Sequence, residues 1–301
     1  MSDATNERAK NCIQSTSLLS VVIATRNASG LLADCLVSLA GQSFRDFEVL
    51  IQDGASTDGT PDLARSFSAV LPNLVVHSEP DSGIYDAWNK ALPHVRGQWV
   101  LFLGSDDTLA GPDVLARCAA VLEELPEDVL YGCGGALEIF PDGSMKRASA
   151  CRAEGAIDRL DVHIPFCHSS LWHRASLFCD IRFDTALRIA ADYQFIFETW
   201  RHDGVGQTLD FVVTHMRVGG ISSHPRHKLR ALWENLLVSA RHGRPVLTRS
   251  RLVPLAKATL LWGVCLLAGR RAPAILDRLR ALRGLPPCWQ TADPLKKERD
   301  T

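Results

Sequence analysis

Two adjacent carboxylates follow directly on a short apolar run near the middle of the chain. Residues 99–103 read Trp-Val-Leu-Phe-Leu, and residues 104–107 read Gly-Ser-Asp-Asp. An uninterrupted apolar run of this length is typical of a strand buried on both faces of a sheet. Open α/β sheets bind ligands beyond the carboxyl ends of their strands, and carboxylate oxygens suit hard divalent cations that also bind diphosphates. The pattern therefore predicts a cation and diphosphate site at Asp106 and Asp107, with helix capping by the same residues as the alternative.

Two other predicted strands also end in polar residues. Thr25 and Asn27 follow the first strand, and Asp53 opens a Gly- and Ser/Thr-rich stretch that ends at Thr60. Asp53 offers carboxylate oxygens to a ribose or a base edge, and the small residues let the backbone approach a ligand. The alternative is a tight turn in which Asp58 or Thr60 caps the next helix. The stretch is neither GxGxxG nor a P-loop, which argues against a dinucleotide or ATP phosphate cradle.

The elements that must position these residues alternate in type along the first half of the chain. Apolar runs and helical spacings predict strand 19–24, helix 31–40, strand 47–52, helix 61–67, strand 74–77, helix 84–92, strand 99–103 and helix 114–125. Repeated β-α-β units of this length indicate an α/β fold with a mainly parallel sheet and helices on both faces. Beyond them the pattern loosens and predicts strands at 129–131, 136–140 and 208–213, a helix at 190–202, and a helical C-terminal tail from Arg226.

Four motifs resemble, in order and spacing, those of the family 2 glycosyltransferases of GT-A fold. They read SVVIATRN at 20–27, VLIQDGASTDGT at 49–60, DSGIYDAWNK at 81–90 and FLGSDD at 102–107. The resemblance covers residues 18–222 and implies a Rossmann-like sheet, a nucleotide-diphosphate sugar donor, Mg²⁺ or Mn²⁺ as cofactor, and inversion at the anomeric carbon. Our interpretation is a glycosyltransferase of hexosyltransferase type that acts on a glycan or lipid-linked acceptor in cell-surface polysaccharide synthesis.

The resemblance assigns the donor side residue by residue. The implied nucleotide-sugar site comprises Thr25, Asn27, Asp53, Asp81, Asp86, Lys90 and Ser105. Within it, Asp53 matches the acid that holds the nucleoside, and the segment from Asp81 to Lys90 borders the donor sugar and diphosphate. Asp86 and Lys90 have i, i+4 spacing, so an exposed ion pair is the alternative for these two.

The metal site departs from the family pattern. Asp106 matches the last acid of the DxD motif, the usual metal contact, whereas Gly104 stands where the first acid falls. The cation would then rest on Asp106, the diphosphate and water, which Mg²⁺ and Mn²⁺ tolerate as ligands. In an extended backbone adjacent side chains point to opposite sides, so we expect Asp107 to point away from Asp106.

The acceptor side is implied by residues later in the chain. Asp192 lies at the start of a predicted helix and matches the family's proposed general base. Inverting transfer needs such a carboxylate to take the proton of the acceptor hydroxyl as the new bond forms, although a helix cap is the alternative. The resemblance also places His168, Arg174 and His224 on the acceptor side, with structural roles for the histidines as the alternative.

Charge divides unevenly along the chain. The net charge is −1, yet residues 226–283 contain 13 Lys and Arg against Glu234 and Asp277, and residues 1–225 contain 17 against 29 acids. Apolar stripes with basic flanks in the later segment predict contact with an anionic membrane surface. A helical cap on the enzyme with a solvated basic face is the alternative.

These features suggest three regions: a polar N-terminal tail at 1–17, a catalytic domain at 18–225, and a basic helical region at 226–301. The tail lacks the apolar core of a signal peptide, and no apolar run is long enough to span a membrane. The nine cysteines show no CxxC spacing, which argues against a zinc site and predicts reduced core residues such as Cys35 and Cys133. We expect a cytoplasmic protein, peripheral at the inner face of the membrane, with no nucleic-acid partner.

Two other functions are compatible with the sequence. A nucleotidyltransferase acting on sugar phosphates also uses a parallel sheet, but it needs a Gly-rich, Arg- or Lys-bearing loop after the first strand, which is lacking here. A degenerate protein that binds a nucleotide sugar without turning it over is supported by Gly104 and opposed by Asp192.

Overall fold

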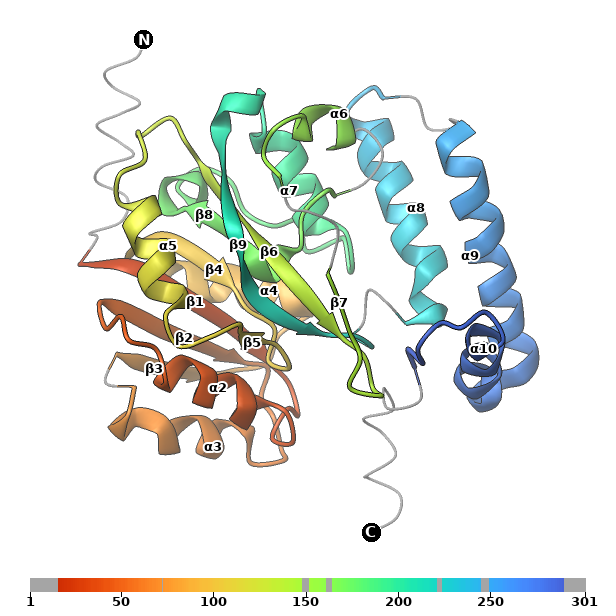
Figure 1. Ribbon diagram of the computed structural model, residues 1–301, viewed down its shortest axis with the longest axis horizontal. Coiled ribbons are helices and arrows are strands. Elements are labelled where there is room, and N and C mark those ends of the chain that lie inside the picture. The colour runs from red at the N-terminus through yellow and green to blue at the C-terminus, as the bar shows by residue number, and fades with distance from the viewer. Residues whose placement is uncertain are drawn as a thin grey trace. The chain divides into compact units, whose positions relative to one another are not determined.

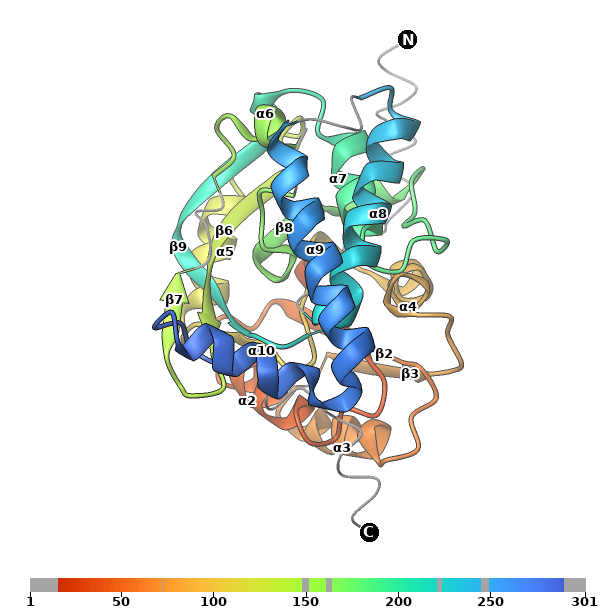
Figure 2. The ribbon, with the colours of Figure 1, turned by 90° about the vertical axis from the view of Figure 1, so that its right-hand side faces the viewer.

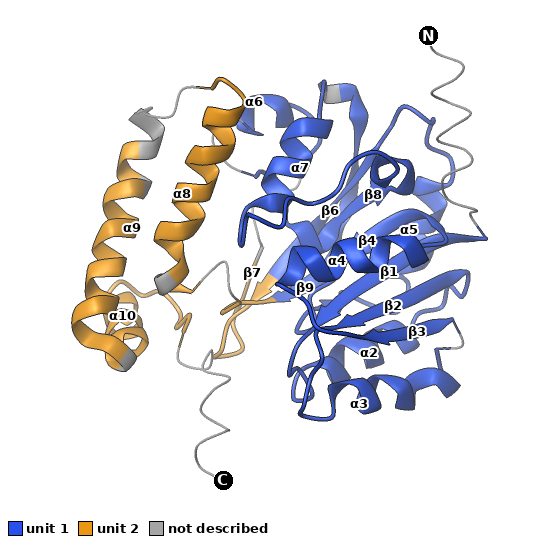
Figure 3. Ribbon diagram, turned by 180° about the vertical axis from the view of Figure 1, so that it is seen from behind, with its two compact units in different colours: residues 1–137, 147–160, 164–216 blue, residues 138–146, 161–163, 217–301 orange. Residues whose placement is uncertain are grey.

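The chain folds into two compact units (Figure 3). The computed structural model describes residues 16–71, 73–147, 152–160, 164–220, 224–244 and 249–289. Unit 1 comprises residues 1–137, 147–160 and 164–216, and unit 2 comprises residues 138–146, 161–163 and 217–301. Unit 1 contains almost all of the sheet, and unit 2 contains the C-terminal helices.

The secondary structure follows the order that the sequence predicts in the first half (Figure 1). The strands are β1 (Ser17–Thr25), β2 (Phe47–Asp53), β3 (Leu74–Ser78), β4 (Gly97–Phe102), β5 (Thr108–Leu109), β6 (Tyr131–Ile139), β7 (Met145–Arg147), β8 (Leu171–Arg174) and β9 (Gly206–Arg217). The helices are α2 (Leu32–Ala40), α3 (Thr60–Ser66), α4 (Ile84–Ala91), α5 (Val114–Leu122), α6 (Ala156–Leu160), α7 (Ala191–Thr199), α8 (Pro225–Arg241), α9 (Arg249–Ala268) and α10 (Ala272–Ala281).

The sheet has the strand order β3-β2-β1-β4-β8-β6-β9-β5, with β7 paired to β6. Strands β3, β2, β1 and β4 are mutually parallel, which requires the crossover helices that the sequence predicts between them. The pairs β4–β8, β8–β6 and β9–β5 are antiparallel. The predicted fold class, a mainly parallel α/β sheet with a helical C-terminal region, is confirmed.

Strand β4 shows why its sequence is an unbroken apolar run. Trp99 and Leu101 pack into the core that α2, α3 and α5 cover. Phe102 lies on the other face of the sheet, and all three side chains are at most 1 % exposed. That second face packs against α4, where the Trp88 ring lies 4.6 Å from the Phe102 ring. Helices therefore cover both faces, and each side chain from Trp99 to Phe102 loses its contact with water.

The antiparallel half of the sheet departs from the sequence expectation. Strand β8 has no clear pattern, and the two strands expected at 129–131 and 136–140 form the single strand β6. The glycines between the two predicted strands admit neighbouring strands at close range. A Cβ on Gly134 would clash with Val213 of β9 and lie 2.9 Å from the carbonyl oxygen of Ser170.

Most of the described cysteines form no disulfide. Cys35, Cys118 and Cys133 are buried thiols, as expected for Cys35 and Cys133. Cys179, for which no specific expectation follows from the sequence, is disulfide-bonded.

Unit 2 is helical, as the C-terminal pattern predicts. Helices α8 and α9 lie side by side in two views at right angles, and α10 follows at the end of α9 (Figures 1 and 2). Among the described residues, no helix is long and apolar enough to cross a membrane.

Candidate active site

The parallel strands end in polar residues at one edge of the sheet. The register places Thr25 of β1 beside Asp53 of β2, and Asp53 beside Ser78 of β3. Because directly opposite residues project to the same face, these three side chains form a row. Leu103, just after β4, donates its N–H to the carbonyl oxygen of Val22 at 2.9 Å, which brings the following turn to the same edge.

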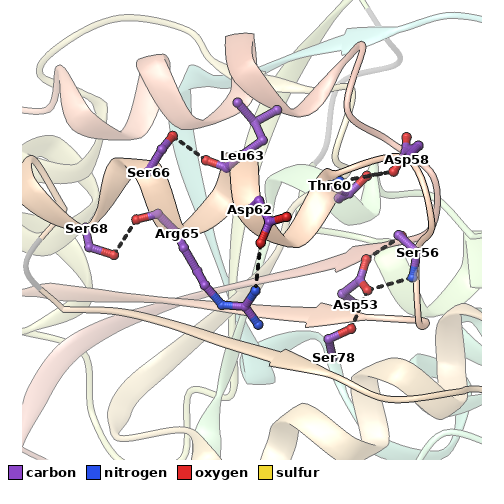
Figure 4. A network of polar contacts seen from close by, with 10 residues as sticks. All are labelled: Asp53, Ser56, Asp58, Thr60, Asp62, Leu63, Arg65, Ser66, Ser68 and Ser78. Atoms are coloured by element: carbon purple, nitrogen blue, oxygen red, sulfur yellow. Dashed lines mark hydrogen bonds and ion pairs between the residues drawn. The ribbon is translucent and has the colours of Figure 1, made fainter.

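Asp53 is fully buried and accepts four hydrogen bonds, of which Figure 4 shows those from Ser56 and Ser78. Its Oδ1 accepts from the hydroxyls of Thr25 at 2.9 Å and Ser56 at 2.5 Å, and its Oδ2 accepts from the hydroxyl of Ser78 at 2.7 Å and the N–H of Ser56 at 2.9 Å. Burial raises the pKa of Asp53, but these hydrogen bonds outweigh burial and hold it below its ordinary value. A carboxylate has about four acceptor positions, so the protein itself occupies those of Asp53.

The loops after β1 and β2 are tied to each other. Asn27 has a φ of 48° and Ala55 a φ of 56°, conformations that residues other than glycine rarely adopt. Asn27 Oδ1 accepts the N–H of Thr57 at 3.0 Å, and Asp58 Oδ2 accepts the N–H of Ser29 at 3.0 Å. The predicted site residues Thr25, Asn27 and Asp53 thus lie together in one hydrogen-bonded structure.

Asp58 and Thr60 form local hydrogen bonds at the start of α3, but the N-cap position of that helix is Gly59 rather than either of them. Asp58 Oδ1 accepts the N–H of Thr60, the first residue of α3, at 3.1 Å. Thr60 Oγ1 in turn accepts the N–H of Ala28 at 2.8 Å. Burial slightly opposes ionisation, but the hydrogen bonds from Thr60 and Ser29 lower the pKa of Asp58 to about 2.

The segment from Gly104 to Asp107 is a tight turn. The N–H of Asp107 donates to the carbonyl oxygen of Gly104 at 3.1 Å. A Cβ on Gly104 would lie 2.8 Å from Asp107 Oδ2 and 3.0 Å from Asp106 Oδ1, so the two carboxylates converge on the same side. The expectation that they point to opposite sides is wrong, because the turn replaces the alternation of an extended strand. The same crowding accounts for glycine here, since an acid at 104 would press against both carboxylates.

Helix α2 and its C-terminal end support this turn from the core side. Side chains of Cys35, Ser38 and Gln42 form hydrogen bonds to backbone groups of residues 104–111 at 3.7, 3.1 and 2.8 Å. Burial, and then the two neighbouring carboxylates, raise the pKa of the Cys35 thiol well above its ordinary value. The thiol is therefore neutral, and the turn rests on uncharged groups.

The donor set at the turn fits a divalent cation that is shared with a ligand. In the part of the chain that the structure describes, no three His, Cys, Asp or Glu side chains are grouped so as to hold a metal by themselves. Asp106 is partly exposed and Asp107 is 5 % exposed. Mg²⁺ is commonly held by one or two carboxylates together with substrate phosphates and water, which is what this pair offers. Ser105 occupies the turn between Gly104 and Asp106.

Asp81 lies at the same edge as Asp53. Its carboxylate packs against Gly54, directly after β2, so closely that a Cβ there would clash. Its Oδ1 accepts the N–H of Gly83 at 2.9 Å at the start of α4. Asp81 therefore joins the donor segment to the loop that follows Asp53.

Asp86 and Lys90 form the ion pair that their spacing allows. The Asp86 Oδ2 to Lys90 Nζ distance is 3.5 Å, and the ammonium donates to the carbonyl oxygen of Pro80 at 2.7 Å. The N–H of Ser82, which donates to Asp86 at 2.8 Å, and then the charge of Lys90 lower the pKa of Asp86. These contacts fix the start of α4 and leave both side chains partly exposed.

Asp192 occupies the first turn of α7 and meets the donor segment. Its Oδ1 accepts the N–H of Tyr193 at 2.8 Å and lies 3.0 Å from the hydroxyl oxygen of Tyr85 on α4. That hydroxyl also lies 2.7 Å from the carbonyl oxygen of Ile189. Among the described residues, none forms a hydrogen bond to Asp192 Oδ2, and the residue is only partly buried. One carboxylate oxygen is therefore positioned by the protein and the other is available.

His168 belongs to an aromatic cluster behind Asp192. Its ring stacks on Trp88 with centroids 4.9 Å apart and lies 5.0 Å from the buried ring of His173. Burial lowers the pKa of His168, although the charge of Asp192 opposes this shift. Its Nε2 is buried without a hydrogen-bond partner in the described residues. His168 is thus a neutral ring that lies close to Asp192.

Arg174 is not brought to this edge of the sheet. It is opposite Trp99, near the beginning of β4, and its guanidinium lies 4.4 Å from the Trp99 ring. It donates to the carbonyl oxygens of Val129 at 2.8 Å, Leu125 at 3.1 Å and Pro126 at 2.8 Å. The acceptor-side expectation for Arg174 is wrong, because these contacts hold it against the α5–β6 connection at the opposite end of the strand. His224 lies in unit 2, where its ring is 5.6 Å from that of His227.

Sequence reasoning missed two residues at the site. Tyr85 lies on the buried face of α4, and its apolar surroundings hide the hydroxyl that reaches Asp192. Arg188 is an exposed cation that reaches the carbonyl oxygen of Ser82 at the start of α4. Tyr85 stands within the 81–90 motif but has no assigned role there, and Arg188 lies outside the four motifs. Each becomes part of the site only through the packing of α4 against the segment before α7.

Comparisons with known proteins agree with the fold. The chain matches the family model of Glycosyl transferase family 2 over residues 20–177. It is 37% identical over 183 residues to a PGL/p-HBAD biosynthesis glycosyltransferase of Mycobacterium tuberculosis, which is 59% of this chain and 68% of that protein. It is 38% identical over 91 residues to the putative teichuronic acid biosynthesis glycosyltransferase TuaG of Bacillus subtilis, covering 30% of this chain and 36% of that protein.

A solved structure shows the same fold. The mannosyltransferase PcManGT from Pyrobaculum calidifontis, in complex with GDP-Man and Mn²⁺, aligns with a TM-score of 0.58 at 20% identity, covering 93% of this chain and 86% of that one. The chain belongs to glycosyl transferase family 2 and is a glycosyltransferase.

Proposed function

We propose that this enzyme transfers a sugar from a nucleotide-diphosphate donor to an acceptor hydroxyl, with inversion, in the assembly of a cell-surface glycan. The named activities of the Mycobacterium and Bacillus relatives support the glycan class. The main structural support is the contact between Asp192 and Tyr85, which joins the predicted base to the donor segment of α4.

Asp192 acts as the general base. As the acceptor oxygen forms its bond to the anomeric carbon, the bond from that carbon to the diphosphate breaks, and the acceptor proton passes to Asp192. Tyr85 and the N–H of Tyr193 hold Oδ1, so Oδ2 takes the proton.

The strand-end loops bind the nucleoside and diphosphate. Asp53 acts by holding Ser56 and Ser78 in place, because its own oxygens are already occupied. Asp81 lies against Gly54 and borders the donor at the start of α4. Arg188, exposed beside Ser82, supplies a cation for the leaving diphosphate.

Asp106, with Asp107 beside it, would hold Mg²⁺ or Mn²⁺. The bound cation would neutralise the charge that develops on the diphosphate as it leaves. The protein's contribution is the turn itself, because Gly104 lets both carboxylates face the same side and α2 fixes the backbone beneath them.

The first experiment is a donor panel. Purified enzyme is incubated with UDP-, GDP- and dTDP-sugars, with and without Mg²⁺ or Mn²⁺, and release of the nucleoside diphosphate is measured. Metal-dependent release from one donor identifies the base and the sugar, and NMR of the product's anomeric configuration tests inversion. Release of pyrophosphate from a nucleoside triphosphate and a sugar phosphate would instead indicate a nucleotidyltransferase.

The role of Asp106 is tested by Asp106→Asn. We expect loss of metal-dependent turnover with an unchanged melting temperature, because the side chain is partly exposed. Asp62→Asn is the matched control, since Asp62 is an exposed carboxylate on α3 whose ion pair with Arg65 lies at the surface. Donor binding without turnover in the wild-type protein, measured by calorimetry, would support the degenerate alternative that Gly104 suggests.

A further inference from the structure

Helix α9 is apolar on two opposite sides. Ala258 and Cys265 are buried in unit 2, where α9 packs against α8. Large apolar side chains on the outer side are exposed: Leu252 53%, Val253 75%, Leu260 69%, Leu266 62% and Leu267 93%. A helix that is apolar all round is stable only if both sides are covered, so the outer side indicates a partner.

The outer residues share one face of the helix. At about 100° per residue, Leu260 and Leu267 lie within about 80° of Leu252 around the axis, whereas Ala258 and Cys265 lie on the opposite side. Figure 2 shows the length of α9 beside α8. Its 20 residues form a continuous strip rather than a local patch.

Helix α10 continues this pattern. Ile275, Leu279 and Leu282 are spaced i, i+4 and i+7, and they are 39%, 51% and 84% exposed. Leu276 and Asp277, on the other side, are buried. Two consecutive helices of unit 2 thus each present an apolar row to solvent.

Tryptophans and cations border these rows. Trp233 of α8 is 68% exposed and Trp262 of α9 is 42% exposed, and both line a pocket of about 560 Å³ with His227 and Arg230. Tryptophan is enriched where apolar and polar phases meet, because its ring is apolar and its N–H is polar. The pocket therefore combines tryptophan rings with a cation, as is typical of protein surfaces at the interface between lipid headgroups and acyl chains.

The exposed charge of this region is positive. Both acids between 226 and 283 are buried, Glu234 at 6% and Asp277 at 2% exposure. The carboxylate of Asp277 accepts the N–H groups of Cys288 and Trp289 at 2.7 and 3.0 Å. Exposed cations include Arg230, Lys257, Arg271, Arg278 and Arg283. A partner that covers the apolar rows must therefore also tolerate cations along their edges.

Charge distinguishes the two simplest occupants. Lys257 stands near the middle of α9 and Arg271 soon after its end, and both are exposed. If a second copy paired through this face, parallel or antiparallel alignment would bring the Lys257 side chains of the two copies close together, which is unfavourable. An anionic lipid surface offers hydrocarbon to the apolar rows and phosphates to the cations at the same time.

We propose that the outer faces of α9 and α10 bind the surface of an anionic lipid bilayer. The leucines enter the boundary between headgroups and acyl chains, and the arginines and Lys257 lie at the level of the phosphates. This binding is independent of the transfer reaction, because it involves no residue of the sheet edge.

The test is vesicle binding by the full-length protein. Sedimentation with phosphatidylcholine vesicles containing phosphatidylglycerol is compared with pure phosphatidylcholine at low and high salt. We expect binding only to the anionic vesicles, weakened by salt. Leu260→Glu and Leu267→Glu should each weaken it by on the order of tenfold, and each of Arg271→Gln and Arg278→Gln by about fivefold.

The control is Val70→Glu. Val70 is 52% exposed in unit 1, so this variant makes the same kind of change on an apolar residue outside the proposed surface, and it should bind as the wild type does. Helix content and melting temperature, measured by circular dichroism, should match across the variants.

Two results would overturn the proposal. One is equal binding of Leu260→Glu and wild type to anionic vesicles. The other is a wild-type dimer in size-exclusion chromatography with light scattering that Leu267→Glu converts to a monomer, which would make a second copy the occupant. Asp192→Asn should bind vesicles normally, so failure of this proposal and failure of the proposed chemistry are separable.

Discussion

Asp53 and Asp192 are two carboxylates of the same unit with opposite environments. Asp53 is fully buried and accepts four hydrogen bonds from Thr25, Ser56 and Ser78. Asp192 is partly exposed, and only its Oδ1 has hydrogen-bond contacts in the described residues. The difference separates a carboxylate that builds the site from one that can react in it.

The contrast follows from where each residue lies in the fold. Asp53 ends a central strand, so its neighbours β1 and β3 supply hydroxyls at fixed register. Asp192 lies in the first turn of α7, where its side chain projects from the helix and is contacted by Tyr85 of α4. A saturated carboxylate contributes stability, whereas an unsaturated one retains the capacity to accept a substrate proton.

The largest effect is expected for Asp192→Asn. Because the amide cannot take the acceptor proton, kcat should fall by about 10²–10⁴-fold while the melting temperature stays within a degree or two. Initial rates with the donor identified by the panel measure this. Glu198→Gln on the same helix is the control and should keep near wild-type rates. A kcat above a tenth of wild type would remove Asp192 from the role of base.

Asp53→Asn should instead destabilise the fold. In the variant, an amide NH₂ group replaces one carboxylate oxygen and therefore faces hydrogen-bond donors that it cannot accept from. We expect the free energy of unfolding, measured by urea denaturation, to fall by about 1–3 kcal/mol. Asp62→Asn, on the exposed surface of α3, is the control and should change stability little. Unchanged stability together with a large loss of kcat would show that Asp53 takes part in the reaction rather than in building the site.

Arg174→Met should affect stability alone. The substitution removes three hydrogen bonds to carbonyl oxygens and the contact with Trp99, at a cost of about 1–2 kcal/mol. Because Arg174 lies away from the strand ends, kcat/KM should stay within about twofold. Arg65→Met, which removes only an exposed ion pair, is the control. A large fall in kcat/KM would restore the acceptor-side role.

The smallest effect concerns Asp58 at acid pH. Its pKa is about 2 in the folded chain and about 3.9 in an unfolded one, so it stabilises the fold above pH 4 and loses that contribution between pH 4 and 2. The side chain is exposed, so the contribution should be below about 1 kcal/mol. NMR titration of the Asp58 carboxyl group should give a midpoint near 2. In Asp58→Asn, the free energy of unfolding should fall slightly less between pH 4 and 2 than in the wild type. A midpoint near 4 would contradict the hydrogen-bonded arrangement.

The sequence predicts the parallel half of the fold well because its signals are local. Apolar runs such as 99–103 are buried on both faces, and each is followed by a helix of regular spacing. Strand β8 and the continuity of β6 are not predictable in this way, because Gly134 is explained only by its contact with Val213. Long-range packing, rather than local preference, decides these elements.

By itself the sequence determined which residues end the strands, and hence that Thr25, Asp53 and Asp106 share one edge. Only the tertiary structure decided what each can do. In the folded chain, hydroxyl groups occupy the oxygens of Asp53, and Asp106 and Asp107 face the same side. Arg174 lies at the far end of β4, whereas Tyr85 and Arg188 lie at the site. The physical reason is that strand ends follow from local periodicity, whereas hydrogen-bond saturation and exposure depend on groups that are distant in the chain.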